Sequence, residues 1–136
     1  MKRAGLLHAE LSGHLARLGH TDRFLVVDAG FPVPESVPVV DLRVVYGLPA
    51  FAPVLAAVLD EVVVEAAVVA TELAGANTAI DAVIGETLGS DAGAVVDRVP
   101  HAELKRAAVG ARFAVRTAED TPYANVLLTA GVGFPL

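Results

Sequence analysis

The sequence contains no cysteine and no tryptophan, and aromatic residues make up only 5% of it. The lack of cysteine excludes disulfides, thiolate nucleophiles and cysteine-based zinc sites, and it fits a reducing cytoplasm. Basic residues are also few, because 10 Lys and Arg stand against 16 Asp and Glu for a formal net charge of −6. Such a chain has no basic stripe for phosphate contacts, so we expect no nucleic-acid partner.

Long hydrophobic runs are missing as well. The longest uncharged stretch, residues 44–59, is interrupted by Gly47, Pro49 and Pro53, and it falls short of the roughly 18–20 residues of a spanning helix. The basic start of the chain leads into no sustained apolar region, so we predict neither a signal peptide nor a membrane partner. Hydrophobic residues nevertheless reach 54%, more than one small core needs, and this surplus predicts a homo-oligomer.

The pattern of apolar and turn residues predicts one domain over residues 1–136. Hydrophobic spacing indicates helices over residues 8–19, 49–59, 80–88 and 100–108, the first of them closed by Gly19 in a left-handed conformation. Strands are expected over residues 24–27, 39–45, 95–99, 113–116 and 125–128. The stretch 62–73 suits a helix or a strand, and we interpret it as a buried strand ending near Ala70. This alternation predicts the α/β class, as a single three-layer α/β/α domain around a mixed β-sheet.

The run Gly19-His20-Thr21-Asp22, with Asp28 a short strand later, holds groups suited to proton transfer. Histidine gives and takes a proton near neutral pH, and carboxylates orient an imidazole or bind hydroxyls. A structural role is equally compatible with these residues, because an imidazole after a helix favourably meets the helix dipole and aspartates form turns. The residues alone leave both interpretations open.

Three histidines, His8, His14 and His20, are spaced six apart. Six residues do not return to the same face of a helix, so we predict no metal site there. We expect His14 to pack in the core or at a subunit interface, and His8 to help cap the first helix. The sequence also lacks a dinucleotide or Walker motif, and we predict no cofactor.

A second group of candidates lies near the C-terminus, where Tyr123 and Asn125 stand two apart on an expected extended segment. Such residues point to the same side, and a phenol beside an amide suits a sugar-like ligand. Ring packing and a turn are the structural alternative. His101, at the start of a predicted helix, has the weakest local pattern.

Taken together, these motifs resemble the D-ribose pyranase family, which is related to the L-fucose mutarotases. The resemblance spans nearly the whole chain and rests on residues 18–22, 28–34, 47–51, 64–66, 122–125 and 130–132. Phe31 stands where a leucine is more familiar. Gly30 stands where the fucose enzymes tend to carry histidine, which favours ribose as the sugar.

The resemblance implies a cytoplasmic isomerase that interconverts the pyranose and furanose forms of D-ribose. It implies that His20 is the proton donor and that Asp28, His101 and the segment Tyr123-Ala124-Asn125 bind the sugar. We expect Asp22 to hold the imidazole. It further implies pentameric rings pairing into decamers, with active sites shared between neighbouring subunits. The alternatives are a mutarotase for L-fucose or another monosaccharide, and a non-catalytic sugar-binding transport accessory.

Overall fold

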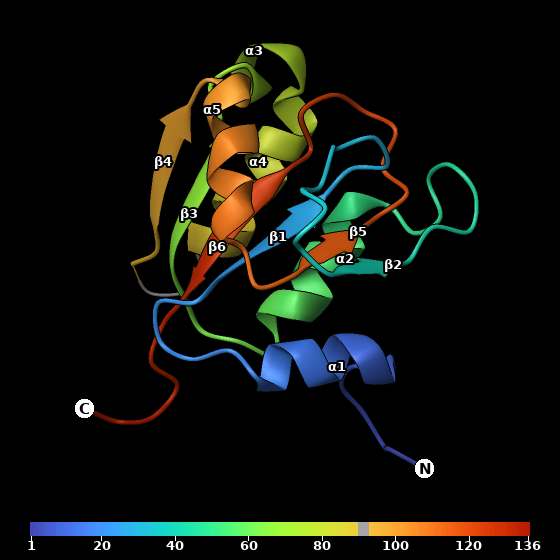
Figure 1. Cartoon of the computed structure of the whole chain (residues 1–136), viewed down its shortest axis with the longest axis vertical. Coiled ribbons are helices and arrows are strands. Elements are labelled where there is room, and N and C mark those ends of the chain that lie inside the picture. Colours follow the sequence, from blue (N-terminus) through green and yellow to red (C-terminus); the bar gives the residue numbers. More distant parts are fainter. Residues whose placement is uncertain (90–92) are drawn as a thin grey trace.

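The structure of the chain, a computed structural model, describes residues 1–89 and 93–136. Six strands form one sheet in the order β2-β5-β1-β6-β3-β4 (Figure 1). In chain order they are β1 (Arg23–Val27), β2 (Val39–Asp41), β3 (Val64–Ala70), β4 (Val95–Val99), β5 (Ala114–Arg116) and β6 (Val126–Ala130). The helices are α1 (Ala9–Ala16), α2 (Phe51–Leu59), α3 (Leu73–Ala76), α4 (Thr78–Gly89) and α5 (His101–Ala107), followed by the 3₁₀ turn Ala108–Gly110.

The sheet is mixed because one strand runs against its neighbours. Strands β1, β5 and β2 are parallel to one another, and β3 is parallel to β4. Strand β6 lies between these two groups and is antiparallel to both β1 and β3. The ends of β1 therefore lie beside opposite ends of β6.

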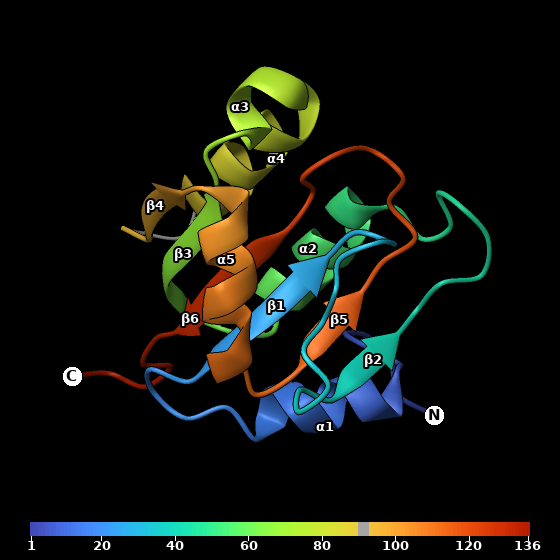
Figure 2. The same cartoon turned by 45° about the horizontal axis from the view of Figure 1, so that its top comes forward.

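Helices cover both faces of the sheet, which confirms the expected three-layer α/β/α fold class (Figure 2). Successive side chains of a strand point to opposite faces. In β1, Phe24 and Val26 pack with the helices α1, α2 and α4, whereas Leu25 and Val27 pack with α5. All four side chains are fully buried, so β1 is the centre of the core. Within the described residues, no helix is both long and apolar enough to span a bilayer.

Most predicted elements, including the strand ending at Ala70, are confirmed, but the first helix is shorter than predicted. It ends at Ala16, and Gly19 does not adopt the left-handed conformation. The left-handed residue is Thr21, with φ of 71°. The physical reason is that the carboxylate of Asp22 accepts the N–H of Gly19 at 2.8 Å and so closes a separate turn after the helix.

Two further expectations differ from the structure. The strand predicted over 39–45 ends at Asp41 because the Arg43 guanidinium folds back onto that carboxylate and the chain then turns at Gly47, whose φ is 81°. The short helix α3 was not predicted. We also expect Gly89 and Ser90 to close the helix predicted over residues 80–88; Gly89 is its last residue in the structure, and Ser90 lies outside the described residues.

Candidate active site

Strand β1 carries candidate groups at both of its ends. Residues 19–22, which we call the histidine turn, precede it, and Asp28 follows it. Five residues at about 3.3 Å each separate the two by roughly 17 Å. One chain therefore has two separate centres, the histidine turn and the pocket around Asp28.

Asp28 is fixed by Asn125 across the ends of β1 and β6. The N–H of Asp28 donates to Asn125 Oδ1 at 2.9 Å, and Asn125 Nδ2 donates back to Asp28 Oδ2 at 3.1 Å. The N–H of Gly30 donates to the other carboxylate oxygen at 3.0 Å. Asn125 is only 1% exposed, and it still has one amide hydrogen and one lone pair to offer a ligand. The pair holds a carboxylate in one orientation at the rim of a hollow.

The rings of His101 and Tyr123 form the other wall. They meet edge to face with centroids 5.1 Å apart, and His101 also meets the edge of Phe31 at 6.0 Å. Among the described residues, His101 Nδ1 is buried without a hydrogen-bond partner. Tyr123 has φ of 58°, so the segment is not extended there as expected. A backbone strained in this way is often found at a binding site.

His101 is anchored by a carboxylate from the end of β3. Its N–H donates to Glu72 Oε1 at 3.0 Å and Oε2 at 3.1 Å. The pKa of Glu72 lies below its ordinary value, first because the Thr71 hydroxyl donates to it and second because the His101 N–H does. The charged anchor keeps the first turn of α5 against the pocket.

The resulting hollow has a volume of about 240 Å³. Its lining residues are Asp28, Gly30, Phe31, Pro32, His101, Tyr123 and Asn125. Four of the five predicted sugar-binding residues thus come together, whereas Ala124 is fully buried in the core and does not line the hollow.

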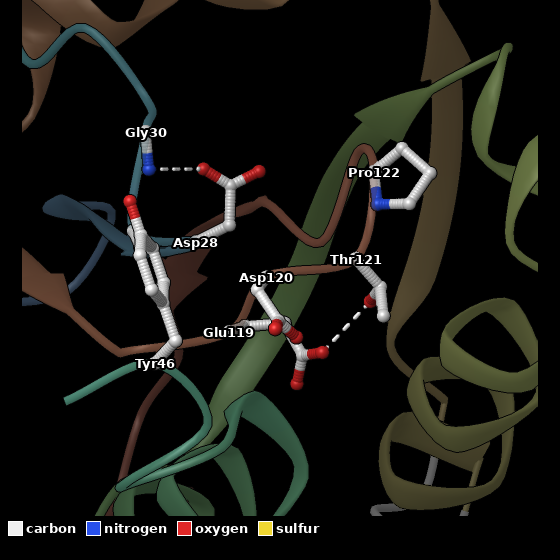
Figure 3. A pocket seen from close by; sticks show the side chains of 8 residues that line it. Asp28, Gly30, Tyr46, Glu119, Asp120, Thr121 and Pro122 are labelled. Atoms are coloured by element: carbon white, nitrogen blue, oxygen red, sulfur yellow. Dashed lines mark hydrogen bonds between the residues drawn. The ribbon is translucent and has the colours of Figure 1, made fainter.

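Asp28 and Gly30 also line a larger adjoining hollow of about 540 Å³ (Figure 3). Tyr46, which stands beside Gly30 in Figure 3, and the acidic loop at residues 119–122 also line it. Glu119 is held in place there, since its carboxylate accepts from the N–H of Phe51 at 2.9 Å and from the Thr121 hydroxyl at 2.7 Å. Tyr46 is 80% exposed, which places a large aromatic side chain at the open rim.

At the histidine turn, the imidazole of His20 is held by Glu65. His20 Nε2 lies 2.9 Å from Glu65 Oε2, and both side chains are about half exposed. The expectation that Asp22 holds this imidazole is wrong. Its carboxylate instead accepts from the N–H of Gly19 and, at 3.1 Å, from Nε of Arg112. These two donors, Gly19 foremost, hold the pKa of Asp22 below its ordinary value.

Glu65 is the site residue that sequence reasoning missed. Its signal is a lone charge in the otherwise apolar strand Val64–Ala70. The other two histidines act as predicted. His8 caps α1 by accepting the N–H of Leu11 at 3.1 Å, and His14 stacks on Phe113 with ring centroids 4.8 Å apart. Among residues 1–89 and 93–136, no group of three His, Cys, Asp or Glu side chains is arranged to hold a metal ion.

Comparison with known proteins gives end-to-end matches. The model of the RbsD / FucU transport protein family matches residues 1–133. Over 134 residues the chain is 50% identical to D-ribose pyranase 1 of Rubrobacter xylanophilus and 48% identical to D-ribose pyranase of Streptomyces coelicolor, covering 98% of this chain and 100% of each relative.

Solved structures agree with these matches. The structure of Bacillus subtilis RbsD complexed with D-ribose superposes with a TM-score of 0.92 at 37% identity, covering 98% of this chain and 100% of that one. A fucose mutarotase from Streptococcus pneumoniae in complex with L-fucose gives a TM-score of 0.83 at 17% identity, covering 98% of this chain and 100% of that one. The second likeness concerns the fold alone.

Proposed function

The chain belongs to the RbsD / FucU transport protein family, and from this premise we propose that it is an isomerase interconverting the pyranose and furanose forms of D-ribose. The observation that carries the proposal is the pocket in which Asp28, Asn125, His101 and Tyr123 converge. The identity of 50% to a D-ribose pyranase along the whole chain supports ribose as the sugar.

The pocket suits a small polyol. Asp28 supplies carboxylate oxygens that accept from sugar hydroxyls, and Asn125 supplies both an amide donor and an acceptor. A hydroxyl of the sugar would also satisfy the unpartnered Nδ1 of His101, and a buried polar atom left unpaired is costly. The aromatic edges of Tyr123 and Phe31 give the sugar an apolar wall. Few polar groups on an apolar wall are typical of a small-molecule site.

The reaction opens one hemiacetal and closes another. The bond between C1 and the ring oxygen breaks, the ring oxygen takes up a proton, and the C1 hydroxyl loses its proton to give the aldehyde. Closure on the hydroxyl of C4 reverses both transfers, so no proton is gained or lost overall. A positioned acid and base each accelerate such a step by about 10²- to 10⁴-fold. We assign the acid to His20, and water returns the proton from the C1 side.

We further propose that each site is shared between two chains. The strand β1 separates His20 from the Asp28 pocket of the same chain by roughly 17 Å, so the acid must come from a neighbouring copy. The exposed apolar loop 44–48, with Tyr46 at the pocket rim, supports a subunit contact there. A decamer built from pentameric rings and a cytoplasmic location are part of this proposal, because the resemblance implies both.

Saturation-transfer NMR on D-ribose tests the function directly. We expect the protein to speed the exchange between pyranose and furanose resonances, and we expect His20→Asn to fold and assemble normally but lose at least about 10² of the acceleration. Exchange at the wild-type rate in this variant would refute the role of His20. A sugar panel separates the alternatives, because faster exchange of L-fucose alone, or binding without acceleration, would overturn the ribose assignment.

Subunit mixing tests the shared site. His20→Asn and Asp28→Asn are each expected to be inactive when assembled alone. Refolded together at equal amounts, they should recover activity because about a quarter of the shared sites then receive both native residues. Activity that stays absent in the mixture, although mass spectrometry shows mixed oligomers, would place both residues in one site of the same chain.

A further inference from the structure

We infer that Glu65 is a positioning residue for His20, and that Nδ1 is the atom through which His20 exchanges its proton with the sugar. The inference rests on the proposed function. It starts from the contact of 2.9 Å between Glu65 Oε2 and His20 Nε2. A carboxylate on one ring nitrogen fixes the tautomer and the ring orientation, and leaves the other nitrogen for chemistry.

A β-bulge directs Glu65 toward the histidine. Val64 pairs with Ala130 and Ala66 pairs with Thr129, so between these two pairs β3 contains one residue more than β6. The extra residue is Glu65. A bulge leaves its extra residue outside the regular pairing and re-aims the side chain, and bulges are frequent beside active sites. The charged second residue of an otherwise apolar strand thereby becomes exposed on the side of the histidine turn.

Ala130 of β6 holds the backbone of the histidine turn. Thr21 N–H donates to Ala130 O at 2.9 Å, and Ala130 N–H donates to Asp22 O at 2.8 Å. Ala130 is also the residue that pairs with Val64 beside the bulge. The backbones that carry the carboxylate and the imidazole are therefore tied to one common point, which fixes their separation.

A second carboxylate supports the turn from its other side. Asp22 accepts the N–H of Gly19 at 2.8 Å and is itself held by Arg112. The turn is thus fixed at its backbone by Asp22 and at its ring by Glu65. Within the described residues, His20 Nδ1 has no hydrogen-bond partner, so this nitrogen is the one left to face a sugar bound by a neighbouring chain.

The chemistry follows from the ring nitrogens. With Nε2–H donated to Glu65, the imidazolium donates its Nδ1 proton to the ring oxygen as the bond from C1 breaks, and the neutral imidazole then takes back at Nδ1 the proton that the C1 hydroxyl has given to water. Loss of the carboxylate lets the ring rotate and change tautomer. The rate of exchange should therefore fall. The affinity for the sugar should stay unchanged, because it depends on the Asp28 pocket.

The test compares Glu65→Ala and Glu65→Gln with Glu86→Gln, an exposed carboxylate of α4 as the matched control. At saturating D-ribose we expect Glu65→Ala to lower the exchange rate by about tenfold, which is less than the 10²- to 10⁴-fold that a general acid itself contributes, because the imidazole is misplaced but still present. Glu65→Gln should recover part of the rate, since its amide oxygen still accepts Nε2–H. The dissociation constant for D-ribose should match that of wild type in all three variants.

A spectroscopic measurement reads the positioning without any activity. Long-range ¹⁵N–¹H correlation distinguishes a protonated from an unprotonated ring nitrogen, and the chain has only 4 histidines to assign by substitution. We expect a single Nε2–H tautomer for His20 in the wild type and a mixture in Glu65→Ala. Unchanged nitrogen shifts, or an unchanged exchange rate in an active protein, would overturn the inference. A wild type that does not accelerate exchange would instead refute the proposed function.

Discussion

Replacement of Asn125 by aspartate changes one side chain of the Asp28 pocket. It turns the attractive hydrogen bond between Asn125 Nδ2 and Asp28 Oδ2 into a repulsive contact between two carboxylates. The amide Nδ2, which lies 3.1 Å from Asp28 Oδ2, becomes a carboxylate oxygen. The oxygen that accepts the Asp28 N–H at 2.9 Å is retained. Size and shape are nearly conserved, so the substitution isolates the effect of charge.

The loss of stability is set by the cheaper of two states of the variant: both carboxylates stay charged and repel each other, or one of them takes up a proton. Two full charges at this separation repel by about 5 kcal/mol at an effective dielectric of 20. Taking up one proton at pH 7 costs about 4 kcal/mol for a carboxyl that ionises near pH 4 when free, and the proton restores a hydrogen bond between the two groups. The second state is cheaper. We therefore expect the variant to be about 4 kcal/mol less stable than wild type at pH 7.

The sign of the pH dependence is fixed by this shared proton. The folded variant binds one proton more than the unfolded chain at neutral pH, so its stability falls as pH rises, by about 1.4 kcal/mol per unit. Near pH 5 the deficit should shrink to about 1.5 kcal/mol. The stability of the variant should therefore come closest to that of wild type at acidic pH.

Guanidinium denaturation at pH 5 and pH 7 and one protein concentration measures the deficit, and Asn125→Ala is the control. The alanine variant loses both hydrogen bonds between Asn125 and Asp28 without adding charge, so its deficit of about 1–3 kcal/mol should not change with pH. A deficit of Asn125→Asp that is equal at both pH values would refute the charge reasoning. Wild-type stability at pH 7 would refute the contact itself.

Three further predictions concern neighbouring features. His101→Phe keeps the edge-on ring packing and removes a buried unpartnered nitrogen, so thermal stability should hold while calorimetry shows ribose affinity reduced about tenfold. Gly131→Val places a Cβ 3.0 Å from Val63 Cγ1 and 3.4 Å from Glu65 Cβ, so the segment that carries Glu65 must shift, and NMR exchange should slow at unchanged ribose affinity. The lowered pKa of Glu72, due to Thr71 and then His101, means that its stabilising contact is complete above the ordinary value of 4.5 and is lost as pH falls. The carboxyl ¹³C resonance of Glu72 should accordingly titrate with its midpoint below the ordinary value.

The core of the fold could be predicted because its pattern is local. The buried run Phe24–Val27 and the helical spacing of Ile80, Ile84 and Leu88 reflect which faces are covered, and the structure buries them as expected. The end of β2 could not be predicted in this way. It depends on one side chain, Arg43, returning to Asp41, which outweighs the strand preference of the valines that follow.

The same distinction between local patterns and distant contacts applies to the candidate site. Asp28, Tyr123 and Asn125 lie in recognisable motifs, whereas His101 was predicted only from the family resemblance, and the structure brings all four together. The partner of the imidazole could not be read from neighbouring residues. Asp22 stands two positions from His20 but faces Gly19, whereas Glu65 stands 45 residues away and reaches the ring through the bulge in β3.

The length of the antiparallel pair β1 and β6 sets the distance between the histidine turn and the Asp28 pocket of one chain. One end of the pair holds the histidine turn through Ala130, and the other joins Asp28 to Asn125. Removing two residues from each strand would preserve the alternation of buried side chains, yet it would draw the two centres together by about 7 Å. In the shared site that we propose, His20 would then fall short of the sugar bound by the neighbouring chain by that distance. The proposed shared site therefore requires that these strands keep their length as well as their composition.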